Sequence, residues 1–328
     1  MFGLKGAYFY LVATQINLIK FLKKIYFSSN HYNNSLRSKI PTQVYFNPNP
    51  FLLSIISPFT KRSFKINELN ANDFWLENKK KVIPEHHNFL WLSLIDRKID
   101  GKNIQKIIYL WMLKYSNFKR KIWETSTLAS RVISWMLNVD TIINNATFEF
   151  KKSFFENIIL QCNHLKRNIR FESDLKKKVE ILTAIILTGL VFKEYEENFN
   201  IGIKELEILI KDFFNNDGFP LSRNPNDLIF FAKYLIFCRE LIKDSQKYVP
   251  EFLQDIIDKN LNCINFIKTP DEQLPLFNGA SAVNLNQIQK YLEKFKPNSR
   301  NNNLGGLHKI KHRNHFLLID IEKPPRKK

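Results

Sequence analysis

Apolar residues recur every three or four positions along most of this chain, the spacing that places them on one face of an α-helix. A clear example is Ile158, Cys162 and Leu165, at steps of four and three. Residues 181–192 are apolar on nearly every side, so we expect their helix to be central. The pattern predicts helices over residues 1–27, 104–115, 128–143, 150–169, 176–192, 203–214, 227–242, 252–267 and 285–295, and a helix that opens near His86.

Two stretches depart from the helical spacing. Residues 28–72 are irregular, because several prolines interrupt short apolar pieces and proline is excluded from helix interiors. Near the end of the chain, a pair of glycines follows a run of asparagines, and the residues at 307–311 and 316–321 predict two strands. A two-stranded hairpin is marginal alone, so we expect these strands to begin a β domain.

Most loops between the predicted helices are short, so successive helices should be antiparallel neighbours. We therefore predict an all-α protein built as an incomplete α/α toroid of helical hairpins around a central cleft, with a short C-terminal β-hairpin. The expected organisation is an N-terminal helix and irregular lead-in over 1–72, the toroid domain over 73–300, and the start of the β domain over 301–328.

The chain is strongly basic, with 50 Lys and Arg residues against 31 Asp and Glu residues and a formal net charge of +19. A field of this sign favours anionic partners such as acidic polysaccharide, nucleic acid or anionic lipid. The alternative is that the lysine excess reflects AT-rich coding and is spread over solvated faces. No glycine-rich nucleotide motif and no nucleic-acid recognition pattern is present, so we expect acidic polysaccharide and no nucleic acid as the partner.

The cysteines and histidines give no metal or cofactor pattern. Cys162, Cys238 and Cys263 lie far apart without a C-x-x-C spacing, and we interpret them as buried thiols. His308 and His312 share a strand face, but no carboxylate pattern accompanies them. We predict no metal site and no cofactor.

The N-terminus combines lysines with a short apolar patch. No apolar run in the chain reaches the ~18 residues that a membrane span requires, so we predict no transmembrane span. For residues 1–27 we predict a basic amphipathic helix or a helix packed on the body, and the segment is no clear signal peptide. The compartment and the oligomeric state stay open from the sequence.

The loop between the helices predicted at 203–214 and 227–242 concentrates polar and charged residues. Asp217 and the Asn and Gly beside it stop the first helix, and two prolines prevent helix across the gap. The loop therefore holds Asp217, Ser222 and Arg223 between two rigid helices, which is a place where binding groups are useful.

A series of short motifs runs through the helical part of the chain. They are Trp75 with His87-Asn88-Phe89-Leu90-Trp91-Leu92, Trp123 with Arg131-Val132-Ile133-Ser134-Trp135, Gln161-Cys162-Asn163-His164-Leu165, Leu187-Thr188-Gly189-Leu190, Asp217-Gly218 with Arg223-Asn224-Pro225, and Leu276-Phe277-Asn278-Gly279. Their order over residues 75–325 resembles that of bacterial heparinase II/III-family proteins.

The resemblance implies an N-terminal α/α toroid and a C-terminal β-sandwich, of which this chain holds the start. It also implies a polysaccharide lyase that cleaves uronic-acid-containing acidic glycans by β-elimination. In that reaction one group neutralises the carboxylate beside C5, while a Tyr or His takes the C5 proton and a Tyr or His protonates the leaving 4-oxygen. The family is usually exported, which suggests the periplasm or cell envelope.

The resemblance also selects candidate site residues. The candidate catalytic residues are His87, His164 and Tyr234, and the candidate substrate-binding residues are Arg131, Trp135, Asp217, Ser222, Arg223 and Asn278. An arginine flanked by tryptophans suits a sugar, and a loop arginine can bind a carboxylate with two parallel hydrogen bonds. The structural alternatives are core histidines, an inter-helix salt bridge for Arg131, a loop arginine bonded to helix ends, and a helix stop at Asp217.

The sequence departs from the family pattern at three places. Lys176-Lys177-Lys178-Val179-Glu180-Ile181 stands where the family has N-H-L-x-x-N, and Pro220 replaces the loop histidine. Asn226-Asp227 follows the loop in place of a tyrosine, and Tyr234 comes more than a turn later. These departures support an alternative, a non-catalytic relative that binds acidic polysaccharide. A second alternative is a basic helical protein that binds nucleic acid or a membrane surface.

Overall fold

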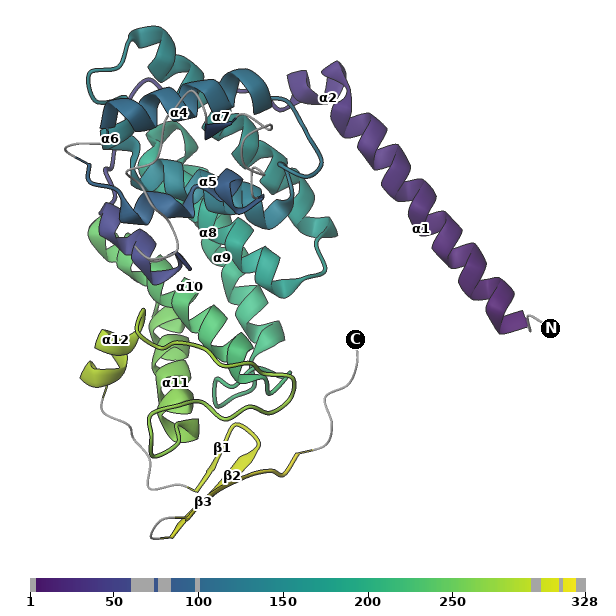
Figure 1. Cartoon of the computed structure of the whole chain (residues 1–328), viewed down its shortest axis with the longest axis vertical. Coiled ribbons are helices and arrows are strands. Elements are labelled where there is room, and N and C mark those ends of the chain that lie inside the picture. The colour runs from purple at the N-terminus through teal and green to yellow at the C-terminus, as the bar shows by residue number, and fades with distance from the viewer. Residues whose placement is uncertain are drawn as a thin grey trace.

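The computed structural model describes residues 4–59, 74–75, 84–97, 101–295, 302–312 and 315–322. These residues form a mainly helical body with a small sheet at one end (Figure 1). The α-helices are α1 (Leu4–Ser28), α2 (Asn30–Ser35), α4 (Gly101–Tyr115), α5 (Thr125–Leu137), α6 (Val139–Ile143), α7 (Phe148–Asn168), α8 (Leu175–Val191), α9 (Glu196–Phe213), α10 (Pro225–Asp244), α11 (Glu251–Ile267) and α12 (Gln289–Lys294). The 3-10 helices are η1 (Pro50–Ile55), η3 (Pro84–Asn88), η4 (Leu90–Leu94), η5 (Ile169–Phe171) and η6 (Lys193–Tyr195).

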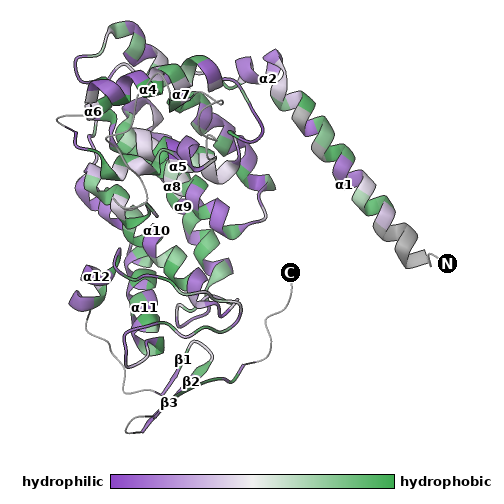
Figure 2. Ribbon diagram, in the orientation of Figure 1, coloured by the Kyte–Doolittle hydropathy of each residue, from purple (hydrophilic) through white to green (hydrophobic). Residues whose placement is uncertain are grey.

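Helical hairpins build the body, as the short loops predict. Helix α8 packs against α9, α5 and α10, and α10 packs in turn against α11. From Val179 to Val191 every residue of α8 is buried, which confirms its central place. The close approach of α8 to α9 requires glycine, because a Cβ at Gly189 would lie 2.2 Å from the backbone nitrogen of Phe199. Figure 2 shows the resulting concentration of apolar residues within the body.

The prediction of a helix that opens near His86 is wrong. The segment instead forms two 3-10 helices, η3 and η4, on either side of Phe89, whose φ of 57° lies in the left-handed region. The side chain of Asn88 accepts a hydrogen bond from the backbone of Leu90, a local bond that competes with helix formation. Phe89, Leu90 and Leu92 are nevertheless all buried.

The helix predicted over residues 128–143 is likewise divided. Helix α5 ends at Leu137 and α6 starts at Val139, with Asn138 between them. The Asn138 side chain donates to the Ser134 carbonyl oxygen at 2.9 Å. This bond satisfies a carbonyl at the end of α5 and so stabilises the break.

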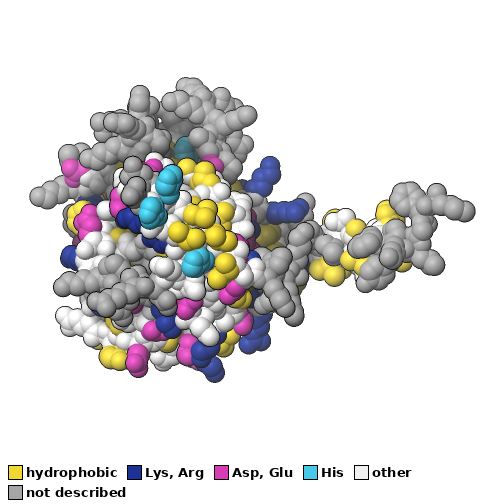
Figure 3. Space-filling view, turned by 90° about the horizontal axis from the view of Figure 1, so that it is seen from below, with side chains coloured by type: hydrophobic (Ala, Val, Ile, Leu, Met, Phe, Trp, Pro, Cys, Tyr) yellow, Lys and Arg dark blue, Asp and Glu magenta, His cyan; other side chains and the backbone are white. Residues whose placement is uncertain are grey.

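The C-terminal strands form a three-stranded antiparallel sheet. Its strands are β1 (Asn303–Leu304), β2 (Leu307–His312) and β3 (His315–Asp320), so the two predicted strands are present and a short third one precedes them. Leu307 is buried against the body, whereas Ile310, Leu317 and Ile319 are partly exposed. Figure 3 shows hydrophobic side chains with histidines beside them on the end of the molecule seen from below. The predicted boundaries at residues 73 and 301 fall outside the described residues, so the division into domains stays a prediction.

Helix α1 stands apart from the body (Figure 1). Within the described residues, its contacts with the body lie toward its C-terminal end. The Phe27 ring lies 5.2 Å from the Phe118 ring and 5.3 Å from the His164 ring, centroid to centroid, and Lys23 Nζ lies 4.6 Å from the Phe171 ring centroid. Among the described residues, no helix is long and apolar enough to cross a membrane.

Candidate active-site cavity

A cavity of about 430 Å³ opens among α5, α8 and α10 and the segments that cover their ends. Helix α10 contributes Lys233 and Tyr234, helix α8 contributes Lys176 and Glu180, and helix α5 contributes Ser130. The walls are completed by Ile56, Pro58, Leu90, Asn226, Ile229, Phe230, Val283 and Gln287. We call this space the Tyr234 cavity. It combines apolar walls with a few titratable groups, the usual composition of a ligand site.

Glu180 and Tyr234 form a buried acid pair at the wall of the cavity. The Tyr234 hydroxyl donates to Glu180 Oε1 at 3.2 Å, and the Ser126 hydroxyl donates to Glu180 Oε2. Burial raises the pKa of Glu180 to about 7 despite these two hydrogen bonds. Burial and the nearby Glu180 carboxyl both raise the pKa of Tyr234 well above 10. Near neutral pH, Glu180 can therefore accept a proton while Tyr234 remains a proton donor.

The cavity also holds a half-buried lysine, Lys233. Burial lowers the pKa of Lys233, and within the described part of the chain no carboxylate offsets that effect. The other lysine of the wall is already paired, because Lys176 Nζ lies 2.5 Å from Asp227 Oδ1. An anionic group that entered the cavity would give Lys233 a counter-charge.

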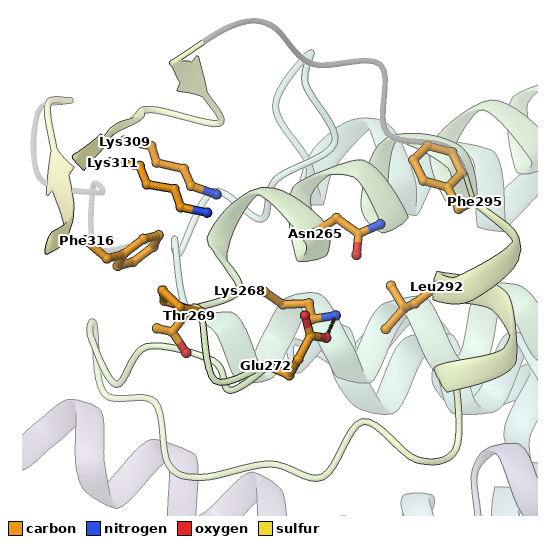
Figure 4. A pocket seen from close by; sticks show the side chains of 10 residues that line it. Asn265, Lys268, Thr269, Glu272, Leu292, Phe295, Lys309, Lys311 and Phe316 are labelled. Atoms are coloured by element: carbon orange, nitrogen blue, oxygen red, sulfur yellow. Dashed lines mark ion pairs between the residues drawn. The ribbon is translucent and has the colours of Figure 1, made fainter. Parts of the chain in front are cut away.

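A second cavity, of about 420 Å³, lies between the end of α11, α12 and the sheet (Figure 4). Lysines line it, but two of them already have protein partners. Lys309 Nζ donates to the Phe266 carbonyl oxygen at 2.7 Å, and Lys268 forms an ion pair with Glu272. These contacts stabilise the end of α11 against the sheet, so the Tyr234 cavity is the better candidate for a functional site.

His87 and Arg131, predicted from the sequence as site residues, lie in a buried polar network. Arg131 Nη1 donates to the His87 carbonyl oxygen at 2.9 Å, Arg131 Nε donates to Gln161 Oε1 at 2.6 Å, and the guanidinium lies 4.3 Å from the Trp111 ring centroid. Trp111 Nε1 donates to His87 Nδ1 at 3.0 Å. Burial, followed by the Arg131 charge, lowers the pKa of His87 to about 3. The network links α4, α5 and α7 to η3, so these residues have a structural role.

His164 and Trp135 are equally buried. His164 Nδ1 lies 2.7 Å from the Tyr32 hydroxyl, and burial, followed by nearby arginines, lowers its pKa to about 4. Trp135 is fully buried, with its ring 5.2 Å from both the Phe89 and Trp111 rings, centroid to centroid. The structure thus brings His87, Arg131, Trp135 and His164 into the core and not to the Tyr234 cavity.

The loop between α9 and α10 holds the sheet against the body. Arg223 Nε lies 2.8 Å from Asp320 Oδ2, and Asp217 Oδ2 accepts a hydrogen bond from the Gly305 backbone at 2.9 Å. Asn278 Nδ2 donates to the Arg223 carbonyl oxygen at 3.1 Å. Ser222 donates to Asp227 at 2.6 Å. These four predicted substrate-binding residues all have protein partners here, and Tyr234 is the one predicted site residue in the cavity wall.

Sequence reasoning missed two members of the cavity. Glu180 carries a signal that could have revealed it, because it is the only acidic residue in an otherwise apolar half of α8. Acidic residues are rarely buried without a partner or a task. Lys233 gives a weaker signal, since it follows an apolar run and directly precedes Tyr234.

The described residues contain no group of three or more His, Cys, Asp or Glu side chains arranged to hold a metal ion. The three cysteines are free and buried, and burial raises the pKa of the Cys162 thiol to about 11. On the sheet, His308 Nδ1 lies 2.5 Å from Asn303 Oδ1, so that ring has a protein partner.

The helical hairpins of the body form an α/α toroid. The chain is similar to the crystal structure of heparan sulfate lyase HepC from Pedobacter heparinus, with a TM-score of 0.53 and 14% sequence identity. The match covers 79% of this chain and 48% of that one, so the chain spans about half the length of that protein. No protein-family model matches the sequence, and a search of curated proteins gives no match either. At this identity the likeness shows the fold.

Proposed function

We propose that this chain is the helical part of a polysaccharide lyase that cleaves uronic-acid-containing glycans by β-elimination at the Tyr234 cavity. The observation that carries the proposal is that a carboxyl of raised pKa, a tyrosine and a half-buried lysine line one cavity of a toroid. The likeness to a heparan sulfate lyase supports the reaction class, because that protein's fold is shared.

Each of the three groups suits one need of the reaction. Lys233 would pair with the uronate carboxylate, which makes the proton on C5 more acidic. Glu180, whose pKa is about 7, would take that proton. Tyr234 would give its hydroxyl proton to the 4-oxygen as the C4–O bond breaks and the C4–C5 double bond forms. The proton taken by Glu180 can then return to Tyr234 through their hydrogen bond.

This assignment predicts how cleavage depends on pH. The base form of Glu180 must be present, so the rate should rise with pH through about 7, the pKa of that carboxyl. Tyr234 must stay protonated, and its raised pKa keeps it so across the neutral range.

The test is the ultraviolet absorbance of the new double bond when the full chain meets a panel of uronic-acid polysaccharides. Glu180→Gln and Tyr234→Phe should each lower the rate at least about a hundredfold, the usual contribution of an acid or base. Lys233→Gln should mainly weaken substrate binding. Lys243→Gln removes the same charge from an exposed position on the same helix and should behave as the wild type. Cleavage that survives both Glu180→Gln and Tyr234→Phe would refute the assignment.

A second candidate function is binding of the same glycans without cleavage. The hydrogen bonds from Ser126 and Tyr234 to Glu180 favour it, because both carboxyl oxygens already have partners. Measurable binding that Lys233→Gln weakens, together with a flat absorbance trace at every pH tested, would select this candidate over the lyase.

A further inference from the structure

Helix α1 presents an apolar face that nothing in the described part of the chain covers. The helix is fixed at one end by Phe27 and projects away from the body over the rest of its length (Figure 1). Its 25 residues correspond to a rod of about 37 Å at 1.5 Å per residue. The projecting part therefore offers a large surface to something outside this chain.

The exposed apolar residues share one half of the helix. At about 100° per residue, these positions fall within a half-turn of one another around the axis, while Asn17 and Lys23 fall on the other half. The large exposed residues are Tyr10 (72%), Leu11 (60%), Leu18 (57%), Ile19 (53%), Phe21 (58%), Leu22 (54%), Ile25 (54%) and Tyr26 (48%). Contiguous apolar exposure of this kind marks an interaction surface.

The charge of the helix selects its partner. The sequence of α1 contains lysines at positions 5, 20, 23 and 24 and no Asp or Glu. A second copy of this chain would bring the same positive charge against the first, which is unfavourable. A polyanion such as a glycan would satisfy the lysines but leave the apolar half in water. An anionic lipid surface satisfies both, because it offers negative headgroups above an apolar layer.

We propose that α1 docks the protein on an anionic lipid surface. The helix lies in the plane of the surface, with Leu18 and Leu22 among the acyl chains and the half that holds Lys23 toward the headgroups and water. Tyr10 and Tyr26, at the two ends of the apolar half, suit the boundary between headgroups and acyl chains. The body that carries the Tyr234 cavity is then held beside the surface by Phe27.

The test is co-sedimentation of the full chain with vesicles of phosphatidylglycerol, compared with vesicles of phosphatidylcholine. We expect binding to phosphatidylglycerol that weakens as salt rises. Leu18→Glu and Asn17→Glu form a matched pair, since both positions are exposed, adjacent and changed by one negative charge. Leu18→Glu should weaken binding at least about tenfold, the loss expected when one apolar anchor becomes charged. Asn17→Glu should weaken it no more than about threefold.

The two variants also guard against a folding artefact, because neither position contributes to the buried core. Thermal unfolding of the body should be the same for both variants and the wild type. Equal loss of binding in the two variants would overturn the proposal, as would equal binding to the two lipids. Concentration-dependent dimerisation that Leu18→Glu abolishes, without vesicle binding, would assign the face to a second copy instead.

Discussion

The buried carboxyl of Glu180 lowers the stability of the folded protein at neutral and higher pH. Burial raises its pKa to about 7, so the folded protein holds a proton there that the unfolded chain has lost between about pH 4.5 and 7. The free energy of unfolding must therefore fall as the pH rises through this range. The difference between the two pKa values corresponds to at most about 3 kcal/mol above pH 7.

Glu180→Gln should remove this loss of stability. We expect the variant to be more stable than the wild type by about 1–3 kcal/mol at pH 8 and by much less at pH 5, because glutamine does not ionise. Chemical denaturation at both pH values measures the difference. Ser126→Ala is the useful comparison, since it removes a hydrogen bond to Glu180 but keeps the carboxyl, and it should not stabilise the protein at pH 8.

Sequence reasoning selected titratable residues of the core, and of the cavity residues Glu180, Lys233 and Tyr234 it selected Tyr234 alone. Arg131 between aromatic residues looks like a sugar-binding group, and the same pattern also fits a buried arginine stacked on Trp111. The two cases differ only in which side of α5 faces the central cavity, and the helical period does not specify that. Tyr234 was identified because the family resemblance implies a tyrosine after the loop, whereas nothing distinguishes Lys233 from the many other lysines of the chain.

At the scale of elements, the packing of α8 on α9 depends on Gly189. A Cβ there would lie 2.2 Å from the Phe199 nitrogen, so alanine must push the helices apart. We expect Gly189→Ala to lower the free energy of unfolding by about 2–4 kcal/mol. At Gly101, in α4, the nearest atom to an added Cβ lies 3.7 Å away. Gly101→Ala should therefore be neutral or slightly stabilising, and equal effects of the two changes would contradict the packing argument.

The loop before α10 should control the order of the sheet. Arg223 is largely buried and lies close to two carboxylates of the C-terminal strand region, Asp320 and Glu322. Arg223→Gln leaves Asp320 without its cation, so we expect amide hydrogen exchange in β2 to become at least about tenfold faster, while exchange in α8 is unchanged. If glycan affinity falls instead and the exchange of β2 is unaffected, Arg223 binds substrate as the sequence resemblance predicts.

The elements themselves were largely predictable, because each long helix of the body buries an apolar stripe. Where prediction failed, local side-chain bonds overrode the stripe. Asn88 and the left-handed Phe89 divide one expected helix, and Asn138 divides another. These breaks depend on backbone conformations that asparagine favours but does not require, so the apolar pattern alone cannot place them.

At the scale of the whole molecule, a field from a net charge of +19 draws in polyanions of every kind. Under the proposed function, selectivity for uronates would come from the Tyr234 cavity, where Lys233 is half-buried and Glu180 and Tyr234 are within the same wall. Long-range attraction is screened over about 10 Å at 0.1 M salt, whereas a partly buried pair is screened much less. Raising the salt concentration should therefore distinguish long-range attraction by the net charge from binding in the Tyr234 cavity.

We expect double-stranded DNA and a uronic-acid polysaccharide both to bind at low salt, and only the polysaccharide to retain appreciable affinity as salt rises. Lys233→Gln should weaken polysaccharide binding about tenfold at moderate salt, the effect of losing one charge-assisted hydrogen bond, and leave DNA binding within about twofold. Lys243→Gln, on the outer face of the same helix, should leave both unchanged at moderate salt. Titrations at several salt concentrations give these affinities. If Lys233→Gln and Lys243→Gln weaken both ligands alike, the molecule binds polyanions through its surface charge and the cavity makes no selection.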